Sequence, residues 1–201
     1  MSLRKNNVQA ADGNMSSQPT KRLTKRQWRD HLKALLQKES PHSSVQISHQ
    51  ICENLTEFLA DKKGVWAGYL ALPQEPDLNP VFRHSLNIEW AYPRMEADHL
   101  VFYISQNFIK GPFGVMEPSE DSQKLSLDEL DGILVPGLGF NKKGRRLGKG
   151  RGFYDRALAD YKGPKIGVCF DCQVVEEDLP EEEHDIRVDA LVTEEAIIQC
   201  K

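Results

Sequence analysis

Pro136-Gly137-Leu138-Gly139-Phe140, followed by Gly144-Arg145-Arg146-Leu147-Gly148-Lys149-Gly150-Arg151-Gly152-Phe153-Tyr154-Asp155-Arg156, is the stretch of this chain that decides the fold. An apolar run over residues 133–135 precedes it, and Leu158 and Tyr161 continue a helical pattern after it. A strand, a glycine-rich loop and a helix in this order are typical of phosphate sites, because glycines let backbone N–H groups approach an anion and a helix N-terminus carries partial positive charge. Six cations fall within residues 142–151, which favours a polyphosphate or polyanion as the ligand: Lys142, Lys143, Arg145, Arg146, Lys149 and Arg151.

Two other interpretations of this loop stay open on spacing alone. Basic, glycine-rich loops are often solvated connections, and an isolated Gly-x-Gly-x-Gly pattern is a weak signal. Asp155, in the first turn of the expected helix, can pair with the helix dipole, worth ~0.3–1 kcal/mol. Alternatively it can hold the metal of a metal–nucleotide complex, since Mg²⁺ prefers one or two carboxylates plus substrate phosphates.

The composition predicts a soluble globular protein with one domain. The chain has 201 residues, 39% hydrophobic and 28% charged, with a net charge of −4. No apolar run approaches the ~20 residues that span a bilayer, and the start lacks an apolar signal segment. The four cysteines form no obvious disulfide framework, which favours a reducing cytoplasm. For Cys169-Phe170-Asp171-Cys172, a core cysteine with an exposed neighbour is favoured over a redox pair or half a zinc site.

The first ordered element is predicted to be a helix that begins at Thr24. Residues 1–22 are polar and aperiodic, as expected of a disordered tail, and the ordered domain would span 23–201. Thr24-Lys25-Arg26-Gln27 has the form of a capping box. Lys25 and Arg29 share a face of this helix, which on composition alone is a solvated basic face. A second face carries the buried stripe of Trp28, Leu32, Leu35 and Leu36.

Helices and short apolar runs alternate along the rest of the chain. This order predicts an α/β fold with a mainly parallel sheet covered on both faces. Ligands of such sheets bind beyond the carboxyl ends of the strands, where the glycine loop would lie. The acidic segment 176–185 is interpreted as a solvated loop. We expect a helix over 47–58, a helical turn over 127–130, a helix from the glycine loop to about 161, and strands over 65–70, 88–92, 100–104, 133–135, 165–170 and 190–193.

Between about Thr24 and Thr193 the chain resembles the 5-formyltetrahydrofolate cyclo-ligase (methenyltetrahydrofolate synthetase) family. The strongest part is the glycine-rich stretch quoted above. Several separated motifs in one order support it: Lys25-Arg26-Gln27-Trp28-Arg29, Tyr69-Leu70-Ala71-Leu72-Pro73-Gln74-Glu75, Tyr92-Pro93-Arg94, Gly111-Pro112-Phe113-Gly114-Val115-Met116-Glu117-Pro118, His184-Asp185 and Val188-Asp189-Ala190-Leu191-Val192-Thr193-Glu194.

The resemblance implies a three-layer α/β/α domain and an ATP-dependent ligase. The expected reaction converts 5-formyltetrahydrofolate into 5,10-methenyltetrahydrofolate, with Mg²⁺ accompanying the nucleotide and with release of ADP and phosphate. The γ-phosphoryl group would pass to the formyl oxygen, and N10 would attack the resulting iminium phosphate. Such a transfer needs positioning and charge neutralisation more than a covalent catalyst.

The resemblance also assigns roles to individual residues. Arg151, Lys149 and Asp155 would be catalytic, Asp155 and Asp189 would share the Mg²⁺ ion, and Glu75 and Tyr154 would contact the folate. Two departures are Phe153, where the family usually has a tyrosine, and Gln74-Glu75-Pro76-Asp77, which replaces the commoner Glu-Val-Asp or Glu-Ile-Asp run. The implied ATP contacts are Lys25, Arg26, Arg29, Arg146, Leu147, Gly148, Lys149, Gly150, Arg151, Gly152, Phe153 and Tyr154.

Competing hypotheses are an RNA-binding module and a family relative with altered or lost activity. The basic loop suits a phosphate backbone, but the negative net charge and the absence of arrayed aromatic residues argue against RNA. We therefore expect a small-molecule substrate, no nucleic-acid or membrane partner, a cytoplasmic location and a monomer.

Overall fold

The computed structural model describes residues 22–38, 41–84, 87–111 and 114–201. The predicted tail therefore lies, apart from its last residue, outside the described residues. No helix in the described ranges combines the length and the apolar character that crossing a membrane requires. The elements are α1 (Lys25–Leu36), α2 (Pro41–Leu59), β1 (Gly64–Ala67), α3 (Asn79–His84), β2 (Ile88–Glu96), β3 (His99–Ile104), β4 (Phe108–Lys110), β5 (Met116–Pro118), β6 (Gln123–Leu125), η2 (Leu127–Glu129), β7 (Gly132–Val135), β8 (Gly139–Asn141), β9 (Arg146–Leu147), α4 (Phe153–Ala157), β10 (Lys165–Val168), η3 (Asp171–Gln173), β11 (Val174–Val175), β12 (Ala190–Val192) and β13 (Ile197–Gln199).

An eight-stranded sheet forms the centre of the molecule, in the order β13-β12-β10-β7-β1-β2-β3-β6. The strands from β12 to β2 are parallel, and the outer strands β13, β3 and β6 pair antiparallel. The four residues of β7 are all buried, as expected of a strand covered on both faces. The predicted α/β fold with a mainly parallel sheet is therefore confirmed.

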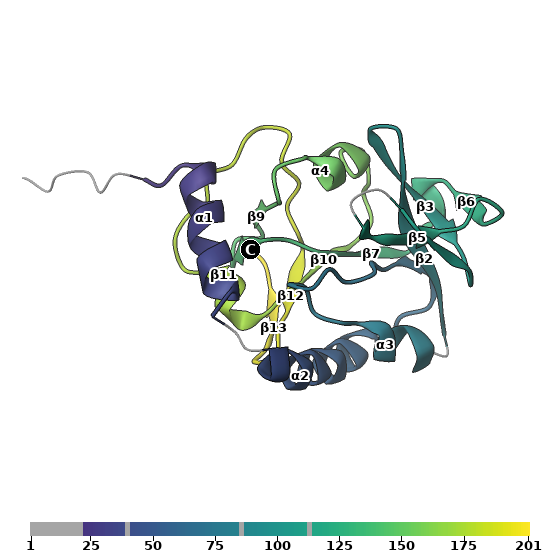
Figure 1. Ribbon diagram of the computed structural model, residues 1–201, viewed down its shortest axis with the longest axis horizontal. Coiled ribbons are helices and arrows are strands. Elements are labelled where there is room, and N and C mark those ends of the chain that lie inside the picture. Colours follow the sequence, from purple (N-terminus) through teal and green to yellow (C-terminus); the bar gives the residue numbers. More distant parts are fainter. Residues whose placement is uncertain (1–21, 39–40, 85–86, 112–113) are drawn as a thin grey trace, which may run out of the picture.

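Helices and loops cover both faces of this sheet (Figure 1). Figure 1 shows α2 and α3 on one face, α4 on the other, and α1 beside the end of the sheet. Ile51 and Leu55 of α2 pack in one apolar core with Trp28 and Leu32 of α1, and Leu158 belongs to a second core on the opposite face. These three layers place the loops that follow β1 and β7 at one edge of the sheet.

The helix α1 begins as the sequence predicts. The side chain of Thr24 accepts a hydrogen bond from the backbone N–H of Gln27, and the Gln27 side chain accepts one from the backbone of Thr24. This reciprocal capping box satisfies two N–H groups that a helix start leaves without partners. Trp28, Leu32 and Leu36 are buried, which confirms the predicted stripe.

Several predicted elements have other bounds in the structure; the strands over 65–70 and 165–170, for example, end at Ala67 and Val168. The helix after the glycine loop ends at Ala157 rather than near Tyr161, and residues 158–160 form a turn. With five residues, this helix has a weak dipole, so positive charge at the site comes from side chains. The strand over 100–104 is antiparallel to β2, because the chain reverses at Ala97, which adopts φ +52°.

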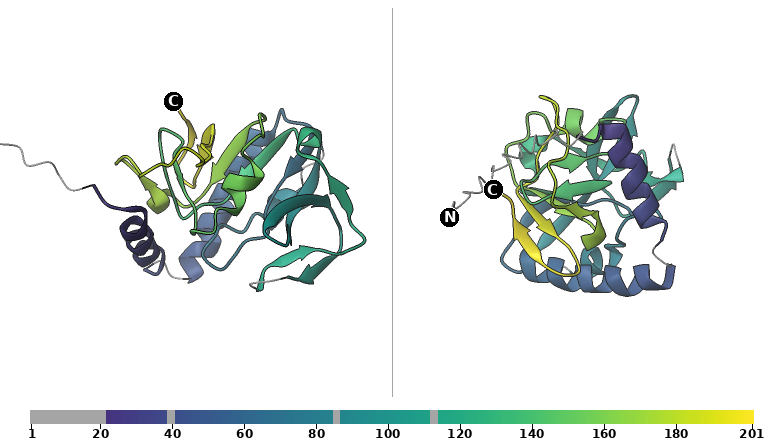
Figure 2. Two further views of the ribbon diagram at one scale, coloured as in Figure 1. Left: turned by 90° about the horizontal axis from the view of Figure 1, so that it is seen from above. Right: turned by 90° about the vertical axis from the view of Figure 1, so that its left-hand side faces the viewer.

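A small sheet of order β11-β8-β9 was not predicted from the sequence. The hairpin β8–β9 carries the basic loop, and Figure 2 gives two further views of the chain around it. Phe140 of β8 is buried against the central sheet, where the absence of a side chain at Gly137 and Gly167 leaves room for its ring. The hairpin is thereby fixed to the sheet, and it returns the chain to the edge at Gly148.

Candidate active site

A cavity of about 330 Å³ opens at the carboxyl ends of β1 and β7. Its size lies in the range of pockets that bind small molecules. One wall is the loop over residues 148–155, a second is the segment 69–75 after β1, and a third, mostly apolar, includes Met95, Leu100 and Val115. The glycine-rich loop therefore does border a pocket at the edge of the sheet where ligands were expected.

Arg146 and Asp155 form an ion pair at the base of this pocket. Arg146 Nη2 lies 2.7 Å from Asp155 Oδ1, and the two side chains are 4% and 11% exposed. Arg146 Nη1 donates to the carbonyl of Pro136 at 3.1 Å, and Asp155 Oδ1 also accepts from the backbone N–H of Ile186. The sequence assigned these residues separately to phosphate and to metal, and the structure joins them.

Lys149 and Glu75 form a second ion pair across the pocket. Lys149 Nζ lies 2.6 Å from Glu75 Oε1, while Glu75 Oε2 accepts from the backbone N–H of Leu72 at 2.9 Å. The Glu75 side chain is 7% exposed and that of Lys149 is 40% exposed. The structure thus pairs a residue predicted to bind phosphate with one predicted to bind folate.

The three basic residues predicted on α1 take different positions. Arg29 donates from Nε to the carbonyl of Gly148 at 3.0 Å and lies beside Gly150, so it supports the glycine loop. Lys25 is bound to Asp185 at 2.6 Å and Glu182 at 3.2 Å, which directs it to the acidic segment. Arg26 is exposed. Among these three, only Arg29 contacts the loop.

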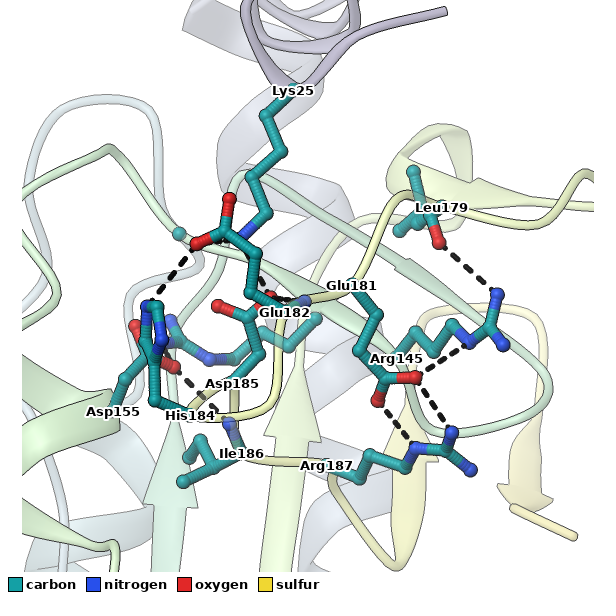
Figure 3. A network of polar contacts seen from close by, with 12 residues as sticks. Lys25, Arg145, Asp155, Leu179, Glu181, Glu182, His184, Asp185, Ile186 and Arg187 are labelled. Atoms are coloured by element: carbon teal, nitrogen blue, oxygen red, sulfur yellow. Dashed lines mark hydrogen bonds and ion pairs between the residues drawn. The ribbon is translucent and has the colours of Figure 1, made fainter. Parts of the chain in front are cut away.

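Carboxylates of the acidic segment 176–185 form ion pairs with cations of the basic hairpin, which the sequence did not reveal. Lys142 pairs with Glu176 and Lys143 with Asp178. Figure 3 shows Arg145 and Arg187 meeting Glu181, and Lys25 meeting Glu182 and Asp185. The predicted solvated loop is confirmed, and its carboxylates also pair with cations of the hairpin and of α1.

Asp189 lies away from the pocket, which contradicts the predicted carboxylate pair. It precedes β12, level with Lys165 at the amino end of β10, and Asp189 Oδ2 accepts from the Lys165 backbone N–H at 2.7 Å. Asp155 borders the pocket at the carboxyl ends of the parallel strands. Because the amino and carboxyl ends of parallel strands lie at opposite edges of a sheet, the two carboxylates do not meet.

Leu147, which was predicted to contact ATP, has its side chain in the core. It is 1% exposed and packs in the core, so its side chain is not available to a ligand. The other members of the glycine loop that border the pocket are Gly148, Lys149, Arg151, Gly152, Phe153 and Tyr154. Gly152 has φ +63° and Gly150 φ +107°, conformations that favour glycine.

Two tyrosines, Tyr69 and Tyr154, border the pocket. Burial, reinforced by the nearby charge of Glu75, raises the pKa of both Tyr69 and Tyr154. The Tyr69 hydroxyl is buried without a hydrogen-bond partner in the described part of the chain. The Arg146 guanidinium lies 5.7 Å from the ring centre of Tyr154. Sequence reasoning assigned no role to Tyr69, although this residue opens one of the motifs shared with the family.

Cys169 is buried and Cys172 is half-buried. Burial raises the pKa of the Cys169 thiol well above its ordinary range. A high thiol pKa disfavours the thiolate that redox chemistry and metal binding require, in agreement with the predicted core cysteine.

Comparison with known proteins identifies the family. The family model for 5-formyltetrahydrofolate cyclo-ligase matches residues 21–194. This chain belongs to the 5-formyltetrahydrofolate cyclo-ligase family. A probable 5-formyltetrahydrofolate cyclo-ligase of Schizosaccharomyces pombe is 29% identical over 203 residues, covering 88% of this chain and 98% of the relative. The 5-formyltetrahydrofolate cyclo-ligase of Escherichia coli K12 is 39% identical over 98 residues, about half of each chain.

A solved structure agrees with this assignment. The 5,10-methenyltetrahydrofolate synthetase of Aquifex aeolicus is 33% identical and superposes with a TM-score of 0.77, covering 88% of this chain and 93% of that one. The resemblance to the cyclo-ligase family that the sequence showed is therefore confirmed.

Proposed function

We propose that this protein catalyses the ATP-dependent cyclisation of 5-formyltetrahydrofolate to 5,10-methenyltetrahydrofolate, with release of ADP and phosphate. Membership of the 5-formyltetrahydrofolate cyclo-ligase family over residues 21–194 is the observation that carries the proposal. The pocket supports it, because basic residues of the glycine loop face an apolar wall. The cavity between them has room for a ring system.

The reaction proceeds in two steps. The formyl oxygen attacks the γ-phosphorus, the bond from that phosphorus to the β,γ-bridging oxygen breaks, and ADP leaves. The product is an iminium phosphate, whose carbon is attacked by N10. The carbon–oxygen bond then breaks, inorganic phosphate leaves with the former formyl oxygen, and N10 loses its proton. Positioning and charge neutralisation carry both steps.

The basic side of the pocket would hold the nucleotide phosphates. Arg146, Lys149 and Arg151 border the cavity, and Arg29 supports the loop that carries them. Lys149 and Arg151 would neutralise the charge that develops during phosphoryl transfer. Lys25 and Arg26 would reach the phosphates only from the rim, with Lys25 leaving the acidic segment to do so.

Asp155 is the residue we propose to hold Mg²⁺. Both of its hydrogen bonds fall on Oδ1, so Oδ2 remains for the cation beside the nucleotide phosphates. Mg²⁺ takes few protein carboxylates and completes its shell with phosphate oxygens and water. When bound, the ion would neutralise charge on the triphosphate. Asp189 is omitted from this site because it lies at the other edge of the sheet.

Glu75 and Tyr154 are the proposed folate contacts from the first two walls. Glu75 would accept a hydrogen bond from an N–H of the pterin ring, once Lys149 has turned to a phosphate. Tyr154 would stack on or beside the ring. The apolar residues of the third wall, such as Met95 and Leu100, would exclude water from the reacting formyl group.

The reaction is tested by incubating the pure protein with 5-formyltetrahydrofolate, Mg²⁺ and ATP and following the absorbance of the methenyl product. Appearance of that absorbance with equal release of ADP supports the proposal, and its absence would refute it. Omission of Mg²⁺ or ATP from parallel reactions tests the two requirements separately.

We propose that the protein acts as a monomer on a small-molecule substrate in the cytoplasm. An RNA-binding role is disfavoured, because the outer cations Lys142, Lys143 and Arg145 already pair with carboxylates of the acidic segment. A surface neutralised in this way attracts a phosphate backbone weakly.

A further inference from the structure

A third carboxylate, Glu117, lies in the third wall of the pocket. It is the middle residue of β5, which packs against β2, and Figure 1 shows these strands side by side. Glu117 is 6% exposed, and Val115, Met95 and Leu100 border the cavity with it. Neither the phosphate contacts nor the folate contacts proposed above use this residue.

The β4–β5 hairpin is shaped around this carboxylate. The backbone N–H of Gly111 donates to the carbonyl of Val115, which closes the hairpin next to Glu117. A Cβ atom on Gly111 would lie 2.4 Å from Glu117 Oε2 and 2.3 Å from its Cδ. Gly111 does not have a positive φ, so its backbone would tolerate a side chain. The absence of a side chain at Gly111 therefore leaves room for the Glu117 carboxylate.

Glu117 lacks the cation that stabilises the other carboxylates of the pocket. Glu75 pairs with Lys149 and Asp155 with Arg146. Within the described ranges, the cation that acts on Glu117 is Arg94, and its guanidinium forms an ion pair with the exposed Glu120 at 3.6 Å. Burial raises the pKa of Glu117, opposed by the backbone N–H of Met95 and by Arg94.

A buried carboxylate with so little compensation destabilises the ligand-free protein, and a ligand that brings hydrogen-bond donors to it would offset this cost. The triphosphate is anionic and would be repelled from this wall. The folate ring system carries several N–H donors on a flat, largely apolar body, which matches one carboxylate set among Met95, Leu100 and Val115.

We infer that Glu117 is a second folate-binding residue, which accepts hydrogen bonds from N–H groups of 5-formyltetrahydrofolate. This inference rests on the proposed function. It makes the third wall a determinant of specificity: Glu117 selects a ring with donors at this position, whereas the apolar side chains around it would accept any flat ring.

The inference is tested with Glu117→Met and Glu117→Gln in the full chain. Asp121→Asn is the matched control, because Asp121 lies close in sequence, is exposed and bonds to Ser119 rather than to Arg94. KM for 5-formyltetrahydrofolate and for ATP, kcat, and the thermal unfolding midpoint are measured for each. We expect Glu117→Met to raise the folate KM about ten- to 150-fold, as loss of a hydrogen bond to a charged group does, and to leave the ATP KM within about twofold. Glu117→Gln, which retains an acceptor oxygen, should give a smaller increase, and Asp121→Asn none.

Thermal unfolding separates this role from a structural one. Replacing a poorly compensated buried charge with an apolar side chain should leave the unfolding midpoint of Glu117→Met equal to or above that of the wild type. A lower midpoint, equal increases in both KM values, or an unchanged folate KM in an active wild-type background would overturn the inference and leave the proposed function standing. Failure of the wild-type protein to form the methenyl product would refute the proposed function, and the inference with it.

Discussion

The ion pair between Lys149 and Glu75 predicts that one substitution has opposite effects on the two substrates. Each residue is proposed to serve a different ligand, yet in the ligand-free protein their charged atoms lie 2.6 Å apart. A nucleotide that draws Lys149 to its phosphates must break this pair, and doing so releases the Glu75 carboxylate for the folate. Glu75→Gln removes the charge that holds Lys149, so it should favour the nucleotide and disfavour the folate.

The magnitudes follow from the exposure of the pair. The Lys149 side chain is 40% exposed, so solvent screens the interaction and about 0.5–1 kcal/mol is a reasonable value. Loss of this competition should tighten binding of nucleotide about two- to fivefold. A hydrogen bond to a charged group contributes about 1.5–3 kcal/mol, so binding of 5-formyltetrahydrofolate should weaken about ten- to 150-fold.

Isothermal titration calorimetry of the wild type and Glu75→Gln measures both affinities. The ligands are 5-formyltetrahydrofolate and, in the presence of Mg²⁺, a non-hydrolysable ATP analogue. In the wild type, the analogue should also tighten folate binding by up to about fivefold, and Glu75→Gln should abolish this coupling. Asp77→Asn is the control, because Asp77 is an exposed carboxylate of the same segment and asparagine can keep its hydrogen bond to the backbone N–H of Asn79.

A result in which Glu75→Gln weakens both ligands equally would refute this reasoning, because it would make Glu75 a structural residue of the loop. Unchanged affinity for the analogue would show that the ion pair does not restrain Lys149. Unchanged affinity for folate would remove Glu75 from the proposed folate contacts.

Three further predictions test other contacts. Asp155→Asn leaves the Arg146 charge buried, a loss of about 3–5 kcal/mol, so the unfolding midpoint measured by circular dichroism should fall by about 6–20 °C; a fall below about 2 °C would contradict a buried pair. Lys142→Ala combined with Lys143→Ala should leave the ATP KM within about twofold, since both cations form exposed ion pairs, and a tenfold rise in a steady-state assay would place them at the phosphates. Asp189→Asn should leave the Mg²⁺ concentration for half-maximal activity unchanged while Asp155→Asn raises it, and equal increases would restore the shared metal site.

The sequence predicted the parts of the fold that depend on local pattern. The capping box at Thr24 needs four consecutive residues, and the apolar run over 133–135 is long enough to mark a buried strand. The position of the glycine loop at the carboxyl ends of the strands follows from the alternation of helices and strands. These features were right because each is decided by neighbours in the chain.

The sequence failed where a contact joins distant segments or an element is too short to show a period. The strands β9 and β11 have two residues each, so no alternation could reveal the small sheet. Lys149 and Glu75 are 74 residues apart, and nothing in either segment indicates the other. For Asp189 the error was geometric: a carboxylate next to a strand of the same sheet was assigned to the wrong end of that strand.

The pairing of the acidic segment with the basic hairpin explains why a protein with a net charge of −4 can carry six cations in ten residues. Lys142, Lys143 and Arg145 occupy the turn of the hairpin and are neutralised by carboxylates of 176–181. Arg146, Lys149 and Arg151 follow and border the cavity. The first group pairs with carboxylates at the surface of the hairpin, whereas the second group lies at the border of the pocket. The count of cations along the sequence includes both groups, whereas only the second group is placed to meet a triphosphate.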